Sequence, residues 1–125
     1  MNKLDASKAV PVFMARNWKH GVLESLPAPA TAFRLDLAST KITDAGLKKV
    51  SQLQKLTSLD LRDTKITDAG LKEVAQLQQL TSLGLASTEI TDAGLKELAQ
   101  LQRLTWLDLG ATQITAAGLK EVAKL

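Results

Sequence analysis

The chain repeats one pattern every 24 residues, and this period constrains its fold more than any other feature. Four columns of identical residues define the period: Leu35, Leu59, Leu83 and Leu107; Ile42, Ile66, Ile90 and Ile114; Gly46, Gly70, Gly94 and Gly118; and Leu47, Leu71, Leu95 and Leu119. The chain therefore divides into four units, at residues 32–55, 56–79, 80–103 and 104–125. Residues 1–31 match the pattern poorly.

The first half of each unit has the alternation of a short strand. In the second unit, Leu59 and Leu61 point to one side of an extended chain, while Ser58 and Asp60 point to the other. One side of this segment is apolar and the other is polar. We therefore expect a strand with one buried face.

The second half of each unit has the spacing of an amphipathic helix. Leu71, Val74 and Leu77 recur at every third position, with Lys, Glu and Gln between them. The pair Thr67-Asp68 before them supplies a side-chain oxygen to cap the free N–H groups of the first turn. Glycine in this turn costs about 1 kcal/mol relative to alanine. Its recurrence in all four units suggests that close helix packing requires it.

A strand and a helix within 24 residues cannot bury their own apolar sides, so neighbouring units have to cover them. We therefore predict an α/β solenoid with a parallel sheet on its concave side and short helices on its convex side. Parallel strands joined by helical crossovers almost always turn right-handed. The predicted solenoid is therefore right-handed.

These residues resemble a known repeat signature. Leu56, Leu59, Leu61, Thr64 and Ile66 match the pattern L-x-x-L-x-L-x-x-N-x-L of leucine-rich repeats, with threonine in place of asparagine. The following segment, residues 66–71, resembles the 24-residue bacterial "GALA-like" subclass. The resemblance covers residues 32–125 and implies a leucine-rich-repeat solenoid with a helical convex side.

The chain departs from this family pattern in two ways, one in every unit and one in the fourth unit alone. The usual asparagine is threonine in every unit, at Thr40, Thr64, Thr88 and Thr112. The family's asparagine bonds backbone groups of adjacent turns, whereas a threonine hydroxyl has one donor where an amide has two. We therefore expect a thinner hydrogen-bond ladder between units. The fourth unit also has Ala116 where the others have aspartate.

Residues 1–31 are interpreted as an N-terminal capping segment, because no other part of the chain could cover the open edge of the first unit. Two structures fit its apolar residues. Val10, Phe13, Met14 and Trp18 could form one helical stripe, or Val10 and Val12 could lie on a strand. A proline-rich connector at residues 27–30 ends any helix before the first unit.

The fourth unit ends at Leu125 with no polar capping unit, which solenoids normally need. Three interpretations remain open: the natural protein continues, two copies cap each other as a homodimer, or the exposed edge is tolerated. We favour self-association or truncation over a free edge. An engineered array is a further alternative, since the units are so alike.

Composition excludes several kinds of site. The chain has no cysteine and one histidine, so we expect no disulfide, thiolate metal site or pair of histidine ligands. Sixteen Lys and Arg against 13 Asp and Glu give a net charge of +3, too small and too dispersed for a nucleic-acid surface. No two glycines lie closer together than eight residues, so we expect no glycine-rich phosphate-binding loop.

No catalytic motif or targeting segment stands out either. His20 lies near Trp18 but has no serine nucleophile motif beside it, so a structural role in the cap is the favoured interpretation. We expect no enzyme activity and no cofactor. No apolar run has the length of a signal peptide or a membrane span, which favours a cytoplasmic location without membrane contact.

The candidate binding surface is the outward face of the strands. The second and third units differ at six positions: Asp60/Gly84, Arg62/Ala86, Asp63/Ser87, Lys65/Glu89, Val74/Leu98 and Gln79/Arg103. Four of the six lie on the outward strand face or just after it, and concave solenoid faces are the usual binding surfaces of such folds. The predicted face carries Arg34, Asp36, Ser58, Asp60, Arg62, Ser82, Gly84, Trp106 and Asp108.

Two features of this face have competing interpretations. An exposed Trp106 beside charges resembles an interaction hot spot. Alternatively, its ring lies over the bare backbone at Gly84. The column Asp36, Asp60 and Asp108 could attract a cation, but hard-cation sites need six to eight oxygen ligands. A salt-bridged face containing neighbouring arginines is therefore favoured over a metal site.

Two functions remain from these observations. The first is a non-enzymatic protein-interaction module that binds an unidentified protein partner through the concave face, with Trp106 as anchor and the charged residues providing complementarity. The alternative is a structural or self-assembling repeat element that associates through its C-terminal edge.

Overall fold

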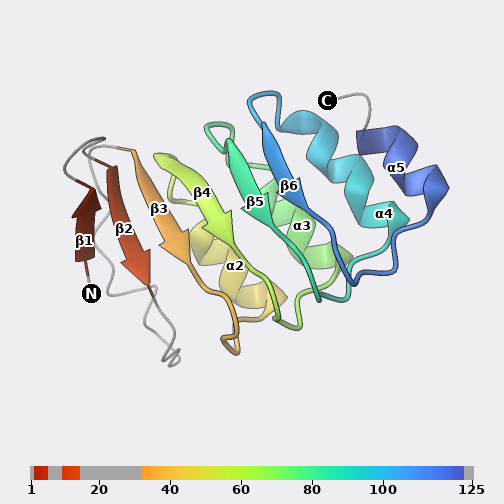
Figure 1. Ribbon diagram of the computed structural model, residues 1–125, viewed down its shortest axis with the longest axis horizontal. Helices are drawn as coiled ribbons and strands as arrows, with labels where there is room; N and C mark the ends of the chain where they lie inside the picture. Colours follow the sequence, from red (N-terminus) through yellow and green to blue (C-terminus); the bar gives the residue numbers. More distant parts are fainter. Residues whose placement is uncertain (1, 6–9, 15–31, 123–125) are drawn as a thin grey trace.

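The computed structural model describes residues 2–5, 10–14 and 32–122, and these form a curved sheet backed by helices (Figure 1). The sheet has six strands in sequence order. They are β1 (Asn2–Asp5), β2 (Val10–Met14), β3 (Phe33–Asp36), β4 (Leu56–Asp60), β5 (Ser82–Gly84) and β6 (Trp106–Asp108). β1 pairs with β2 antiparallel, and every later pair is parallel.

The helices lie on the other side of the sheet, so the chain is the right-handed α/β solenoid that the repeat predicts (Figure 1). They are α2 (Asp44–Val50), α3 (Asp68–Val74), α4 (Asp92–Leu95) with the 3₁₀ helix η1 (Lys96–Gln100), and α5 (Ala116–Val122). The helices are shorter than the apolar spacing predicts. α3 ends at Val74, and Leu77 lies buried in the connection after it. Among the described residues, no helix has the length and apolar character that a membrane span requires.

The start of the chain extends the sheet. Val10–Met14 is a strand, which decides between the two structures that the sequence allows for its apolar residues. It pairs along β3, with Phe13 opposite Leu35. The assignment of residues 1–31 as a cap remains a prediction. Trp18, His20 and the proline-rich connector lie outside the described residues.

The core is a column of aliphatic side chains between the sheet and the helices. Leu59 and Leu83 are at most 1% exposed, and Ile66 and Leu71 are fully buried. Burying each such side chain contributes about 1.5–3 kcal/mol. The fourth unit is less covered: Leu107 is only partly buried, although it packs against this core. Each unit therefore depends on the next one to complete its burial.

The turn after each strand is linked to the next unit by the backbone. Ser39, Asp63, Ser87 and Ala111 adopt positive φ values of 52–58°. The Ser39 N–H donates to the Arg62 carbonyl at 2.9 Å, and the Asp63 and Ser87 N–H groups make the equivalent bonds to the units after theirs. The recurring threonines act within a turn instead. The Thr64 hydroxyl donates to the Leu61 carbonyl at 2.7 Å, and the other three do the same. The ladder between turns is therefore a backbone ladder.

A second link joins the helix starts of successive units. The Asp68 carboxylate accepts hydrogen bonds from the Thr91 N–H at 2.7 Å and the Thr91 hydroxyl at 2.5 Å. Asp44 binds Thr67 and Asp92 binds Thr115 in the same way. We call each such contact an Asp–Thr clamp. A threonine cap of the kind predicted is present at Thr67, whose hydroxyl accepts from the Ala69 N–H, whereas Thr91 makes no side-chain cap bond.

The clamp explains why glycine recurs in the first helical turn. A Cβ at Gly70, Gly94 or Gly118 would lie closer than 3.0 Å to the carboxylate oxygen of the preceding unit's clamp aspartate. At Gly46, the nearest atom is the Ile42 Cδ1 at 3.2 Å, and no carboxylate is among the three closest atoms. The predicted requirement for close packing is therefore confirmed at these three positions, and it comes from a side chain of the neighbouring unit.

Candidate functional site

The predicted surface residues form two neighbouring columns on the outward face of the sheet. Strand pairing places Arg34, Ser58, Ser82 and Trp106 in one column, and Asp36, Asp60, Gly84 and Asp108 in the next. Between these columns, Leu59 and Leu83 point into the core. The alternation in the sequence therefore places the predicted residues on one face, and Arg62 follows at the end of β4.

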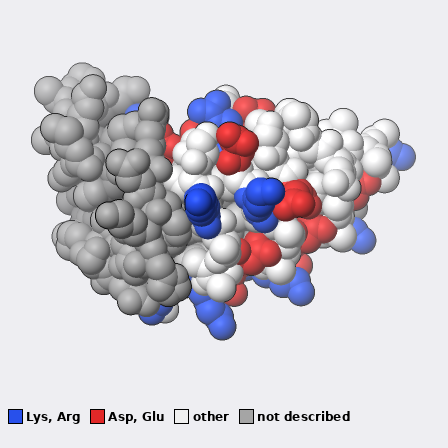
Figure 2. Space-filling model, turned by 90° about the horizontal axis from the view of Figure 1, so that it is seen from below, with Lys and Arg blue, Asp and Glu red and all other residues white. Residues whose placement is uncertain are grey.

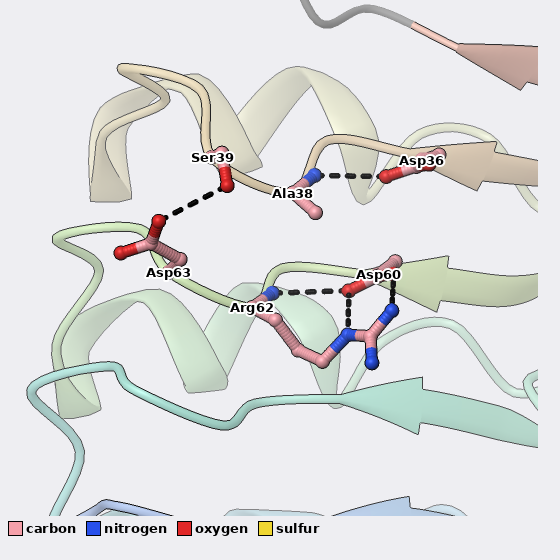
Figure 3. A network of polar contacts seen from close by, with 6 residues as sticks. All are labelled: Asp36, Ala38, Ser39, Asp60, Arg62 and Asp63. Atoms are coloured by element: carbon pink, nitrogen blue, oxygen red, sulfur yellow. Dashed lines mark hydrogen bonds and ion pairs between the residues drawn. The ribbon is translucent and has the colours of Figure 1, made fainter.

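The aspartate column is held by the backbone. Each carboxylate accepts a hydrogen bond from the N–H group two residues later, which closes the turn where the strand ends (Figure 3). The three bonds are Ala38 N–H to Asp36 at 3.0 Å, Arg62 N–H to Asp60 at 3.1 Å, and Gly110 N–H to Asp108 at 3.1 Å. These carboxylates are pre-positioned, and each has a structural role before any partner arrives.

Arg62 pairs with Asp60 on the same strand end. Its Nε and Nη2 donate to the two carboxylate oxygens at 2.9 and 2.7 Å (Figure 3). The hydrogen bond to Asp60, then the charge of Asp60, raise the pKa of Arg62 above its ordinary value. The Arg62 Cγ lies 3.1 Å from the position that a Cβ on Gly84 would take. The side chain therefore lies across the next strand, where glycine leaves room for it.

Sequence models of one repeat family match two segments of this chain. A leucine-rich-repeat model matches residues 54–114, and a second one matches residues 34–51. Together they include β4, β5 and β6, and all of β3 except Phe33. The chain is a leucine-rich repeat protein. The GALA-like subclass is not named by either match and remains a resemblance.

Solved structures of other leucine-rich repeat proteins are similar to this chain. An internalin from Listeria monocytogenes is 27% identical, with a TM-score of 0.48 over 75% of this chain and 32% of its own. The ectodomain of the receptor kinase SOBIR1 from Arabidopsis thaliana is 15% identical, with a TM-score of 0.48 over 100% of this chain and 60% of its own. This chain thus spans less than two thirds of each. No curated protein matches it.

Trp106 and Arg34 are the exposed residues of the first column of this leucine-rich repeat sheet. Trp106 is 50% exposed and lies opposite Ser82 on β5. The three atoms closest to a Cβ built at Gly84 belong to Asp60 and Arg62. A position of the Trp106 ring over the Gly84 backbone stays a prediction. The Arg34 side chain makes no ion pair or hydrogen bond within the described part of the chain.

The three aspartates of the acidic column do not converge on one point. Among the described residues, no three His, Asp or Glu side chains converge where they could hold a metal ion. Gly84 interrupts the column, and Arg62 occupies the Asp60 carboxylate. Within this column, the Asp60 carboxylate is therefore already paired with Arg62.

A hollow that the sequence reasoning missed lies beside this face. It has a volume of about 730 Å³ and opens at the strand-to-helix loops of the first three units. Its lining residues are Thr40, Lys41, Ile42, Thr43, Asp44, Asp63, Thr64, Lys65, Ser87 and Glu89. Two of the six differences between the second and third units, at Asp63/Ser87 and Lys65/Glu89, could have pointed to it.

Proposed function

We propose that this leucine-rich repeat protein binds a protein partner through the concave face of its sheet and catalyses no reaction. Leucine-rich repeat domains generally mediate protein–protein interactions. The observation that carries the proposal is the pair of exposed side chains at the two ends of one column, Arg34 on β3 and Trp106 on β6.

The geometry supports a partner with two kinds of contact group. Three strand spacings separate Arg34 from Trp106, about 14 Å at about 4.8 Å per strand. An apolar group packing on Trp106 and a carboxylate on Arg34 would bind simultaneously. Since the strands are fixed by pairing and the carboxylates by backbone hydrogen bonds, little conformational entropy is lost on binding.

Quantitative affinity capture tests this proposal. The bait variants are Trp106→Ala and Arg34→Ala on the concave face, with Lys72→Ala on α3 as the matched control on the convex side. We expect the wild type and the control to enrich a partner of the concave face equally. Trp106→Ala should lower the affinity for this partner at least tenfold, which corresponds to a loss of about 1.4 kcal/mol or more of binding free energy, as at a hot-spot residue. Equal capture by all variants would exclude this face.

Self-association through the fourth unit is the second candidate, and Leu119 favours it. This side chain is 53% exposed, whereas its equivalents Leu47, Leu71 and Leu95 are at most 1% exposed. A second copy that covers Leu119 would restore this burial. Light scattering over a concentration series, with Leu119→Lys as the variant, tests the idea. A wild-type chain that stays monomeric at the highest concentration contradicts it.

A further inference from the structure

We propose that the hollow at the strand-to-helix loops is a second binding site, which takes an extended peptide segment with two acidic side chains and then a basic one on every second residue. The hollow lies on the edge of the sheet and not on its outward face, so the proposal does not depend on Trp106 or Arg34. The evidence is the charge that its walls leave unpaired, and the way this charge changes from unit to unit.

Several lining groups already have partners within the chain. Both Asp44 oxygens accept from Thr67, at 2.9 and 2.6 Å. The Thr64 hydroxyl donates to the Leu61 carbonyl. Asp63 accepts from the Ser39 hydroxyl at 3.0 Å, across two neighbouring turns (Figure 3). These groups shape the walls and have less capacity left for a ligand.

Three charged side chains of the hollow remain without a partner. Lys41, Lys65 and Glu89 are exposed, and within the described residues none of them makes a side-chain hydrogen bond or ion pair. They occupy equivalent positions in three successive units, about 5 Å apart from turn to turn. The view onto this edge shows positive and negative side chains close together (Figure 2).

This arrangement fits a ligand with both signs of charge. Lys41 and Lys65 occupy equivalent positions in neighbouring units, and each ammonium group can pair with a carboxylate of the ligand. Glu89 follows in the next unit and attracts an ammonium or guanidinium group. Side chains on one side of an extended peptide recur every second residue, about 6.6 Å apart. A segment with glutamates and a lysine on alternate positions, lying along the stack, therefore matches the order of charges.

The comparison of the second and third units supports a role beyond structure. The two units share 18 of their 24 residues, and their turns have the same backbone, with φ values of 56° at Asp63 and 57° at Ser87. Yet Lys65 is replaced by Glu89 and Asp63 by Ser87, which changes the charge of the wall from one unit to the next. The fold accepts either residue at these positions, so folding does not dictate the charges that line the hollow.

The test is an NMR titration of the ¹⁵N-labelled chain with synthetic peptides. The probe has two glutamates and one lysine on alternate positions among serines, and the control peptide has glutamine at all three. At up to roughly millimolar peptide, we expect the charged probe to shift amide signals of residues 39–44, 63–65 and 87–89. Absence of shifts there, or equal shifts with the neutral peptide, overturns the proposal.

Charge exchange between the units provides matched variants. Lys65→Glu and Glu89→Lys each introduce a residue that the equivalent position already holds, and Lys72→Glu on α3 is the control. Lys65→Glu lowers affinity for the probe about fivefold, the factor of one exposed ion pair. Glu89→Lys shifts preference toward an all-glutamate peptide. Equal effects of Lys65→Glu and Lys72→Glu contradict the site. Binding unaffected by Trp106→Ala shows that it is separate from the concave face.

Discussion

The Asp–Thr clamp makes the stability of the stack depend on one carboxylate in each junction. Replacing Asp68 by alanine removes the acceptor of two hydrogen bonds from Thr91, at 2.7 and 2.5 Å. It leaves the strands, the aliphatic core and the backbone ladder in place. The free energy of unfolding of Asp68→Ala therefore reports the contribution of this single contact between the second and third units.

The magnitude follows from the nature of the bonds. Removing a hydrogen bond to a charged group costs about 1.5–3 kcal/mol. Asp68 and Thr91 are half-buried, so water partly replaces the lost bonds and the lower value applies to each. Two smaller effects nearly cancel. Alanine has the higher helix propensity, which stabilises the variant by at most about 0.7 kcal/mol. The loss of a carboxylate at the start of α3 destabilises it by about 0.3–1 kcal/mol. We expect a destabilisation of about 2–3 kcal/mol.

Urea unfolding monitored by circular dichroism measures this loss, and the chain offers a matched control. Ala116 occupies the clamp position in the fourth unit. The variant Ala116→Asp adds a carboxylate to which no threonine of a following unit donates within the described residues. It should change the free energy of unfolding by less than about 0.5 kcal/mol.

A double-mutant cycle then assigns the effect to the contact. Asp68→Ala and Thr91→Val should show a coupling of at least about 1 kcal/mol, whereas Asp68→Ala and Thr115→Val should be additive within about 0.5 kcal/mol. Thr115 donates to Asp92 and not to Asp68. If Asp68→Ala destabilises no more than Ala116→Asp, or if the Asp68–Thr91 coupling is near zero, the clamp does not hold the units together.

Three further predictions concern backbone and charge. Gly94→Ala should be at least about 1 kcal/mol less stable in urea than Gly46→Ala, because both gain helix propensity but only Gly94 faces a clamp carboxylate. The Thr115 hydroxyl and backbone N–H groups lower the pKa of Asp92. The ionised Asp92 therefore contributes its full stabilisation above the ordinary aspartate pKa of about 3.9, and this contribution is lost as the pH falls through the lower pKa of the folded state. In Asp92→Ala, the free energy of unfolding should therefore fall less steeply at acidic pH than in the wild type. Ala111→Gly should raise the thermal midpoint, since alanine at a φ of 52° is strained by about 1 kcal/mol.

The repeat period predicts most of this fold, because burial depends on neighbouring copies in equal register. Leu59 and Leu83 lie opposite each other on paired strands, as their 24-residue spacing requires. The face that carries Arg34 and Trp106 follows from simple alternation along each strand. In these features, equivalent residues of every unit have the same environment. The repeat within one chain is therefore enough to predict which side chains are buried and which are exposed.

Contacts between different positions of neighbouring units could not be predicted in this way. The position of Asp68 before an apolar stripe predicts a cap for its own helix, whereas its oxygens bind a threonine 23 residues later. The position of Trp106 relative to Gly84 depends on side-chain packing across strands, which periodicity does not contain. The hollow is lined by loops of three units, so it depends on contacts between different positions of neighbouring copies.

The outward strand face and the hollow are neighbouring surfaces of the described chain. Trp106 is exposed on the outward strand face, and Lys65 is exposed at the loop edge where that face ends. A single partner could cover the outward strand face and the loop edge together, since no described helix lies between them. Binding of one such partner predicts that the losses caused by Trp106→Ala and Lys65→Glu add within about 0.5 kcal/mol, since the two sites share no contact. If the double variant binds no more weakly than Trp106→Ala alone, the partner of the concave face does not use the hollow, and the two surfaces have separate ligands.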